Sequence, residues 1–313
     1  MNFHEKPVQH IESLTLKVVD LAEMSRFYTP VLGFETIEEQ ANKTILGVAG
    51  QEILILEHTP ELKLKTGRYA GLFHFAILLP NRKELRKMLV HLHQQRIPLG
   101  SSDHQVSEAL YFSDPEGNGI EIYRDRAAGE WEWRGEHVHM TVAPLDVEAV
   151  AHAASGEKWS GMPSGAVLGH IHLHVSDLQA AREFYTEVLG FGLVASLGNQ
   201  ALFVSDGNYH HHIGLNIWSG TGIPALPDTA AGWSHYVIRV SDEQAQRAMH
   251  DRLQAYGAEL HTEGAAVAMG FIWQQNRNRL CIRKSPKRFC GWGIFSLRRR
   301  TRTDRCRIGS DGL

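Results

Sequence analysis

The first 273 residues of this chain contain no cysteine, because all three of its cysteines, Cys281, Cys290 and Cys306, lie beyond them. A framework of disulfide bonds therefore cannot hold the main part of the protein together. No uninterrupted apolar stretch approaches about 18 residues, the length that indicates a membrane-spanning helix. The first residues also lack the basic start and apolar run of a signal peptide. These absences favour a cytoplasmic protein without a membrane segment.

The formal net charge of only -3 hides an uneven distribution of charge. From Gln274 to the end there are 12 Lys and Arg residues and 2 Asp and Glu residues. The first 273 residues contain 20 Lys and Arg residues and 33 Asp and Glu residues. A basic arm for nucleic acid is one interpretation of this segment. Its scattered Trp, Cys and Phe are not typical of such arms. We therefore interpret residues 274–313 as an aberrant basic tail from a shifted reading frame, and we expect no nucleic-acid partner.

The chain contains an internal repeat, in which residues 170–178 (HIHLHVSDL) correspond to residues 13–21 (SLTLKVVDL). The same offset of 157 positions relates FYTEVLGF at 184–191 to FYTPVLGF at 27–34. Alternating apolar residues at the start of each copy predict a strand, and the helical spacing after it predicts a helix. We expect Asp20 and Asp177 to cap these helices, and Gly33 and Gly190 to end them. A strand-then-helix unit has been duplicated.

A second pair of segments is related in the same way, with residues 73–79 (FHFAILL) matching residues 234–240 (SHYVIRV). The segment 111–123 adds the turn Asp-Pro-Glu-Gly-Asn, followed by a short alternating strand. Residues 128–166, with little periodicity, are expected to be a connector. The four segments predict an α+β fold made of four βαβββ modules in two domains. The last module is incomplete because the tail replaces its end.

Histidines gather on one face of the predicted strands. Side chains alternate along a strand, so His170, His172 and His174 share the face opposite to the apolar residues between them. The run at 209–218 (YHHHIGLNIW) is expected to add His210 and His212 to the same concavity, and His235 opens the strand of the fourth module. A single histidine on a strand is usually a hydrogen-bonded packing residue. Convergence from three strands favours a metal site.

These motifs together resemble the vicinal oxygen chelate superfamily, which includes glyoxalases, bleomycin resistance proteins and extradiol dioxygenases. FYTxVLGF, the histidines that open the strands and the DPxGNxIE turn are the elements that match, and the layout is most similar to two-domain bacterial catechol 2,3-dioxygenases. The resemblance implies two vicinal-oxygen-chelate domains, residues 8–127 (modules one and two) and 167–282 (modules three and four). The connector 128–166 would join them.

The resemblance further implies an Fe(II)-dependent extradiol dioxygenase, with Mn(II) as the alternative metal. A small aromatic diol and O2 would be its partners, and the protein would form a homo-oligomer. The metal ligands would be His170, His235 and a residue at position 281. Cys281 stands where the family has a glutamate, which puts the competence of this chain in doubt. His212 matches the family's acid/base histidine.

Module two offers another set of ligands, His74 and Glu121. If modules one and two pair, these two residues form a degenerate site, because the partner position is Ser13. If modules two and three pair instead, His74, Glu121 and His170 complete a triad without the tail. The family's habit favours sequential pairing. Two other functions stay open, namely a glyoxalase-like isomerase or thiol transferase, and a small-molecule-binding protein without catalysis.

Overall fold

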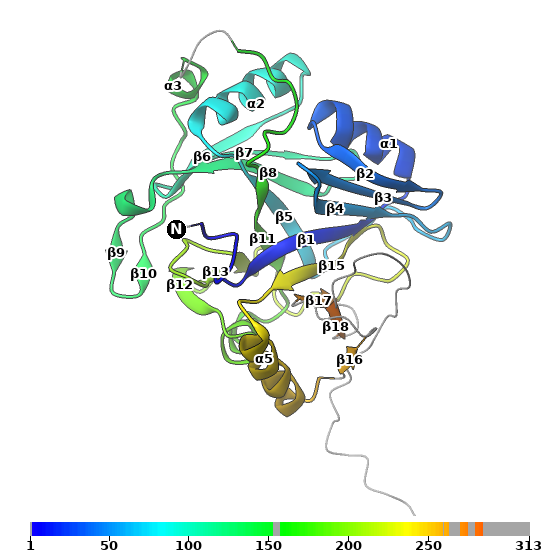
Figure 1. Cartoon of the computed structure of the whole chain (residues 1–313), viewed down its shortest axis with the longest axis vertical. Coiled ribbons are helices and arrows are strands. Elements are labelled where there is room, and N and C mark those ends of the chain that lie inside the picture. Colours follow the sequence, from blue (N-terminus) through cyan, green and yellow to red (C-terminus); the bar gives the residue numbers. More distant parts are fainter. Residues whose placement is uncertain (1, 153–156, 259, 263–269, 275–278, 284–313) are drawn as a thin grey trace, which may run out of the picture.

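The computed structural model describes residues 2–152, 157–258, 260–262, 270–274 and 279–283, with side chains up to residue 258. Four βαβββ modules follow one another along the chain, as the sequence predicts (Figure 1). Modules one and two comprise β1 (His10–Lys17), α1 (Leu21–Arg26), β2 (Glu35–Gln40), β3 (Lys43–Val48) and β4 (Gln51–Glu57), then β5 (Gly71–Leu78), α2 (Arg82–Gln94), β6 (Gly100–Asp103), β7 (Ser107–Ser113) and β8 (Gly119–Asp125). Modules three and four comprise β11 (Val167–His174), α4 (Leu178–Glu183), β12 (Gly192–Leu197), β13 (Ala201–Ser205) and β14 (Ile213–Asn216), then β15 (Gly232–Arg239), α5 (Glu243–Tyr256), β16 (Leu260–Thr262), β17 (Gly270–Gln274) and β18 (Arg279–Arg283).

The repeated helices begin and end where their sequences predict. Asp20 and Asp177 accept a hydrogen bond from the backbone N–H three residues ahead, which satisfies a free donor of the first turn. Each helix continues into one wider turn, Phe27–Val31 in module one and Phe184–Val188 in module three. Gly33 and Gly190 follow at φ +79° and +82°, a left-handed conformation that glycine adopts without strain.

The modules pair differently from the sequential order that we expected. One sheet has the order β16-β18-β17-β15-β1-β4-β3-β2, so that module one pairs with module four. The second sheet has the order β12-β13-β14-β11-β5-β8-β7-β6, so that module two pairs with module three. The contacts that decide this are the antiparallel pairs β1–β15 and β5–β11, with Thr15 opposite His235 and His74 opposite His172. The expected pairing of module one with module two, and of module three with module four, is therefore wrong, because the segments 8–127 and 167–282 each contribute to both sheets.

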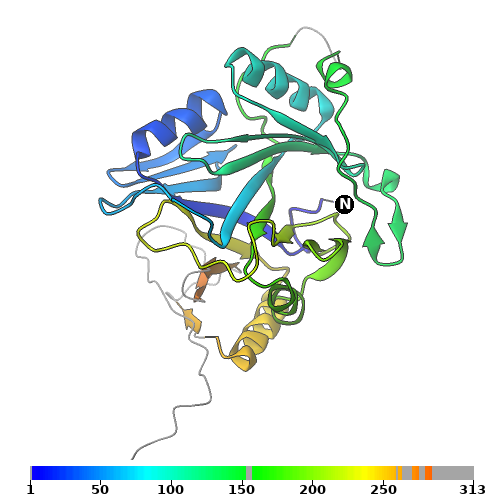
Figure 2. The ribbon, with the colours of Figure 1, turned by 180° about the vertical axis from the view of Figure 1, so that it is seen from behind.

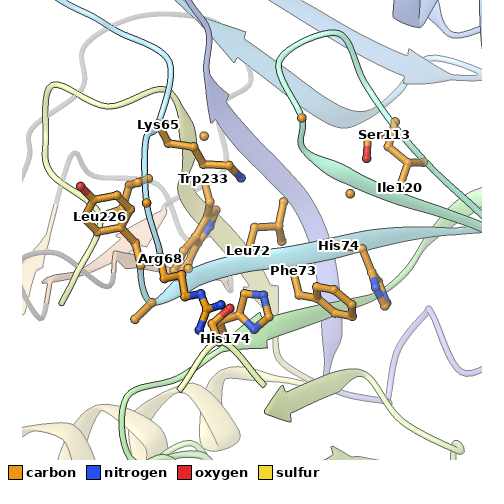
Figure 3. A pocket seen from close by; sticks show the side chains of 18 of the residues that line it. Lys65, Arg68, Leu72, Phe73, His74, Ser113, Ile120, His174, Leu226 and Trp233 are labelled. Carbon is orange, nitrogen blue, oxygen red and sulfur yellow. The ribbon is translucent and has the colours of Figure 1, made fainter. Parts of the chain in front are cut away.

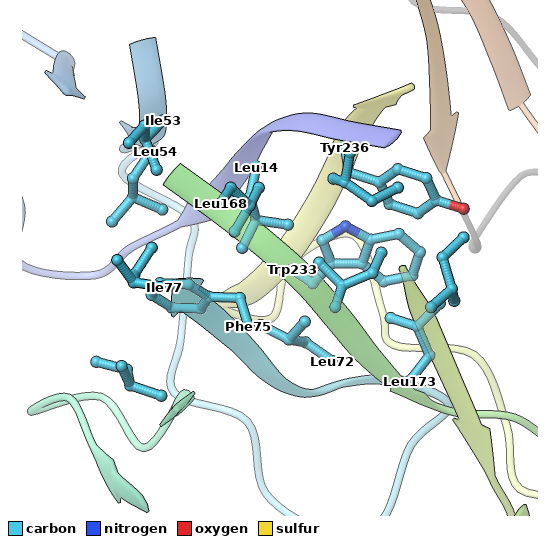
Figure 4. Packing of buried hydrophobic residues seen from close by; sticks show 14 of the residues in the cluster. Leu14, Ile53, Leu54, Leu72, Phe75, Ile77, Leu168, Leu173, Trp233 and Tyr236 are labelled. Atoms are coloured by element: carbon cyan, nitrogen blue, oxygen red, sulfur yellow. The ribbon is translucent and has the colours of Figure 1, made fainter. Parts of the chain in front are cut away.

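One hydrophobic core joins the two sheets. Leu14 of β1, Phe75 of β5, Leu168 of β11 and Trp233 of β15 belong to a single buried cluster (Figure 4). Apolar residues at alternate positions of these strands point into the core, so their polar neighbours point to the other side of the sheet. On β11, Ile171 and Leu173 are the apolar partners. The histidines between them consequently face the concave side of the second sheet.

The connector between modules two and three has structure of its own. It forms a two-stranded hairpin, β9 (Trp133–Arg134) and β10 (His137–Val138), and a short helix α3 (Val147–His152). The hairpin stands out beside the N-terminal residues in both views (Figures 1 and 2). Further along, Asp103 of β6 and Ala143 exchange backbone hydrogen bonds of 2.8 and 3.0 Å. The connector is thereby tied to the rim of the second sheet.

Among the described residues, no helix has both the length and the apolar character needed to cross a membrane.

Candidate metal centre

Two histidines and one glutamate meet on the concave face of the second sheet. His74 lies on β5, His170 on β11 and Glu121 on β8. The ligand atoms of these three side chains lie within 4.8 Å of one another. All three residues are buried, at 6%, 1% and 2% exposure respectively. They form the only such group of three or more His, Cys, Asp or Glu residues found among the described residues.

The spacing of these atoms suits a metal ion. The Nε2 atoms of His74 and His170 each lie 3.0 Å from the same oxygen, Oε2 of Glu121. Ligands about 2.1 Å from an octahedral ion and at right angles to one another would be separated by about 3.0 Å. His74 Nε2 is buried and has no hydrogen-bond partner in suitable geometry within the described structure. A buried ring nitrogen this close to a carboxylate oxygen, without good hydrogen-bond geometry, fits two ligands that share one cation.

The surroundings shift the pKa values of Glu121 and His170 in the directions that favour metal binding. Burial raises the pKa of the Glu121 carboxyl, but attraction to His170, its hydrogen bond and the contact with His74 together outweigh burial and hold this pKa well below its usual range. Burial lowers the pKa of His170, although Glu121 opposes that shift. Metals bind the carboxylate and the neutral imidazole. Both shifts therefore favour the forms of Glu121 and His170 that bind a metal.

The two modules that pair here contribute unequal sets of ligands. His74 and His170 occupy corresponding places on β5 and β11. Glu121 lies opposite Ala76, two residues after His74, and Gly214 lies opposite His172, two residues after His170. Gly214 is therefore the counterpart of Glu121. A Cβ atom at Gly214 would come within 2.8 Å of the His172 ring. The centre consequently has two imidazoles, one carboxylate and no fourth protein ligand at that position.

The triad lies at the wall of a cavity of about 920 Å³. Its lining is largely apolar, with contributions from β5, the connector, β12, β13 and the segment after β14, including Phe73, Val138, Met140, Leu197, Phe203 and Trp218. Tyr111 and His104 also line it, and the Tyr111 hydroxyl bonds to His104 Nε2 at 2.7 Å. The volume is in the range of small-molecule sites, most of which are apolar with a few polar groups.

The histidine run before β14 is arranged differently from the prediction. His211 lines the cavity, with its ring centroid 4.1 Å from that of His170. His212 is used elsewhere, because its Nδ1 lies 3.1 Å from Ser205 Oγ and its Nε2 lies 2.9 Å from the carbonyl oxygen of Phe3. The alternation that we assumed fails because β14 begins only at Ile213. His210 and His212 are not among the residues lining this cavity.

A chain of polar contacts extends from His211 away from the cavity. His211 Nδ1 lies 2.8 Å from Nδ1 of His210, and His210 Nε2 lies 2.8 Å from Oδ1 of Asp125. The carboxylate can only accept, so His210 Nε2 carries a proton, and a neutral His210 then accepts at Nδ1. His211 must in turn donate from its Nδ1. This assignment leaves the other nitrogen of His211, Nε2, unprotonated.

The other ligands expected from the sequence are not brought to this centre. His235 lies on β15 of the other sheet, where its Nε2 is 3.1 Å from Thr15 Oγ1 and its Nδ1 is 3.1 Å from Ser234 Oγ. The backbone of Cys281 pairs with Ile272 and His261, and its side chain lies outside the described residues. His170 is the one residue shared by the expected set and the observed triad. The triad corresponds to the alternative that required modules two and three to pair.

Comparison with known proteins agrees with this fold. The model of the Glyoxalase/Bleomycin resistance protein/Dioxygenase superfamily matches residues 9–122 and 167–271. A catechol-2,3-dioxygenase of Bacillus subtilis (strain 168) is 42% identical over 253 residues, covering 79% of this chain and 88% of that protein.

Solved structures show the same architecture at low sequence identity. A candidate dioxygenase from Bacillus subtilis superposes with a TM-score of 0.58 at 15% identity, covering 90% of this chain and 87% of that one. A mutant of glyoxalase I from Zea mays gives 0.51 at 13% identity, covering 88% and 92%. These two similarities concern the fold alone. With the family model matching well over half of the chain and a relative at 42% identity, the chain belongs to the Glyoxalase/Bleomycin resistance protein/Dioxygenase superfamily.

Proposed function

We propose that this protein is an extradiol dioxygenase that opens the ring of a small aromatic diol with O2, using Fe(II) held by His74, His170 and Glu121. The observation that supports it most strongly is the convergence of two imidazoles and one carboxylate at a buried cavity wall. Two histidines and one carboxylate with open positions are typical of non-haem Fe(II) oxygen chemistry. Mn(II) is the alternative metal, because the same ligands suit it. The similarity to a catechol-2,3-dioxygenase supports the same substrate class.

The bound metal would hold the diol and O2 together and pass electron density from one to the other. The remaining work falls to the residues of the cavity. Phe73, Phe203 and Trp218 offer aromatic surface for the ring of the diol and keep water away from it. The Tyr111 hydroxyl is held by His104, whose Nδ1 lies 2.6 Å from the carbonyl oxygen of Thr141. This arrangement supports a role for Tyr111 in positioning the substrate oxygens.

The proton-transfer role that the sequence assigned to His212 passes to His211 in this proposal. His211 lines the cavity beside His170, whereas both ring nitrogens of His212 have other partners. The contact with His210, backed by Asp125, leaves His211 Nε2 as the free base. That nitrogen would accept the hydroxyl proton that the diol gives up, and His210 and Asp125 would hold the imidazolium in place. A positioned histidine typically contributes about 10²- to 10⁴-fold to a rate.

Two observations weigh against the alternative functions. Isomerases and thiol transferases of this fold usually use two carboxylates or a different metal, whereas Gly214 stands where a second carboxylate would be placed. A protein with a broken triad would suit a binding role without catalysis. The triad of His74, Glu121 and His170 lies entirely on β5, β8 and β11 and does not need residue 281.

The decisive experiment compares metal content and O2 uptake in five proteins. The full chain, His74→Ala, Glu121→Ala, His170→Ala and His235→Ala are loaded anaerobically with Fe(II), desalted and assayed with catechol. We expect about one iron per chain and ring cleavage in the parent and in His235→Ala, and loss of both in the other three. If iron were lost in His235→Ala but retained in His74→Ala, the ligands would be those first expected, His170, His235 and residue 281. Stoichiometric iron in the parent without O2 uptake on any catechol would refute the dioxygenase assignment.

A further inference from the structure

A second pocket, of about 440 Å³, adjoins the metal-site cavity. Phe73, His74 and Tyr111 line both spaces. The rest of this pocket comes from the loop between β4 and β5, the turn before β8 and the start of β15 (Figure 3). We name it the Lys65 pocket. The proposed oxygenase chemistry uses the three shared residues but none of the other residues that line the Lys65 pocket.

The charged groups of the Lys65 pocket have one sign. Lys65 and Arg68 line it, and none of the described residues that line it is Asp or Glu. Neither side chain forms an ion pair or hydrogen bond with another described residue. Figure 3 shows the Lys65 and Arg68 side chains on either side of Trp233, with His174 next to Arg68. Two cations without a counter-ion at a concave surface attract an anion.

Burial makes the unpaired charge of Lys65 costly. The side chain is half-buried, and this burial lowers the pKa of its ammonium group, with Asp114 opposing the shift. Asp114 has other partners, because its carboxylate accepts from the Tyr28 hydroxyl at 2.7 Å and from the Asn118 amide at 2.8 Å. A partly desolvated ammonium group is stabilised by an anion that binds next to it.

The remaining walls of the pocket indicate the body of the ligand. Leu72, Ile120 and Leu226 line it, together with the faces of Phe73 and Trp233. A free phosphate or sulfate ion would leave this apolar surface uncovered, and the volume exceeds what such an ion requires. Small-molecule sites of this size combine apolar walls with a few polar anchors. The shape and chemistry suit an aromatic or short aliphatic group with one carboxylate.

The pocket is built on a braced loop. Lys63 N–H donates to the carbonyl oxygen of Thr229 at 2.9 Å, and Ala231 N–H donates back to Lys63 at 2.8 Å. At the other end, Ala70 N–H donates to Pro224 at 2.8 Å. The loop that carries the two cations is therefore held at both ends against the segment before β15. A preformed site loses less conformational entropy when its ligand binds.

We propose that the Lys65 pocket binds a small organic carboxylate, with Lys65 and Arg68 on the carboxylate and the apolar wall on its body. The pocket shares Phe73, His74 and Tyr111 with the metal-site cavity, but Lys65 and Arg68 do not line that cavity, so this proposal does not depend on the proposed oxygenase function.

Calorimetric titration of the full chain with benzoate, after removal of metal by a chelator, tests this proposal. We expect one saturable site per chain at low ionic strength. The double variant Lys65→Met/Arg68→Met should weaken binding at least about tenfold, since each substitution removes a charge-assisted contact. Lys63→Met removes the same charge from the same loop outside the pocket and should leave the affinity unchanged. His170→Ala should also leave it unchanged, because that residue belongs to the other cavity. Thermal melts of each variant establish that it is folded.

Four results would overturn the assignment. Equal affinity of the double variant and the parent would remove the role of the cations. If benzamide, the neutral counterpart of benzoate, bound as tightly as benzoate, the charge of the ligand would not contribute to its recognition. Inorganic phosphate binding as tightly as benzoate would show that the apolar wall contributes nothing. Loss of binding in His170→Ala with retention in the double variant would place the benzoate in the metal-site cavity.

Discussion

His170 Nε2 lies 3.0 Å from Glu121 Oε2, although the two residues are 49 positions apart and belong to different modules. Glu121 is brought there by β8, which runs parallel to β5, and His170 by β11, which pairs with β5 on its other edge. The strand between them contributes His74. The centre therefore exists only when modules two and three share a sheet, and changes that loosen β5 or β8 should weaken metal binding without touching a ligand.

The turn before β8 provides a first test through two equivalent tyrosines. Tyr28 donates to the buried carboxylate of Asp114 at 2.7 Å, whereas its repeat counterpart Tyr185 contacts the neutral hydroxyl of Tyr236 at 2.9 Å. Hydrogen bonds to charged groups are worth about 1.5–3 kcal/mol and neutral ones about 0.5–1.5 kcal/mol. Urea unfolding should show a larger loss of stability for Tyr28→Phe than for Tyr185→Phe. Equal losses of stability in the two variants would mean that the charge of Asp114 does not strengthen its hydrogen bond with Tyr28.

A second test concerns the close approach of β8 to β5. A Cβ atom at Gly119 would come within 2.2 Å of the backbone oxygen of Phe73 and 3.1 Å of the His74 Cβ. Gly119→Ala should therefore push the strands apart, cost about 1–3 kcal/mol and lower metal affinity through the displaced His74. Gly129→Ala is the control, because nothing lies within 4 Å of its added Cβ. Unchanged iron content in folded Gly119→Ala protein would contradict this close approach of the two strands.

A third test separates the two adjacent histidines before β14. His211→Asn should lower kcat by about 10²- to 10⁴-fold while iron content stays near that of the parent, because this residue is the proposed base and not a ligand. His212→Asn should keep kcat within a few fold, since its ring nitrogens contact Ser205 and the Phe3 carbonyl. Asp125→Asn should lower kcat as well, because the Asp125 carboxylate holds His210, which in turn holds His211. If His212→Asn lowered kcat more than His211→Asn, the proton-transfer role would belong to His212.

Buried histidines should make the metal-free protein sensitive to acid. Burial is the largest cause that lowers the pKa of His172, His211 and His212 well below the ordinary value. In the unfolded chain these groups titrate near pH 6.5. Their contribution to stability is complete above that pH and is lost as the pH falls, because only the unfolded state then takes up protons.

Urea unfolding of the metal-free chain measures this effect. The free energy of unfolding should fall as the pH is lowered from about 7 to about 5, the range in which histidines of the unfolded chain take up protons. His212→Asn should make this fall shallower. A stability that stays constant between about pH 7 and pH 5 would mean that these imidazoles are protonated in the folded protein.

Local structure was largely predictable from the sequence. The duplicated strands, the caps at Asp20 and Asp177 and the glycines that end the helices follow from alternation, capping and φ preferences that act within a few residues. The face of β11 that carries His170 and the turn that precedes Glu121 were identified for the same reason. The one local failure is the run 209–212, which we treated as strand although β14 starts after it.

Which strands become neighbours was decided by the tertiary structure. The first strand of every module has a similar hydrophobic pattern and a free hydrogen-bonding edge, so sequence patterns alone allow β5 to pair with β1 or with β11. Pairing β5 with β11 and β1 with β15 places the apolar faces of both sheets in one core. The same choice unites His74, Glu121 and His170 and leaves His235 on the other sheet beside Thr15. The sequence determined which side chains were available for a metal centre, and long-range strand pairing determined which of them meet.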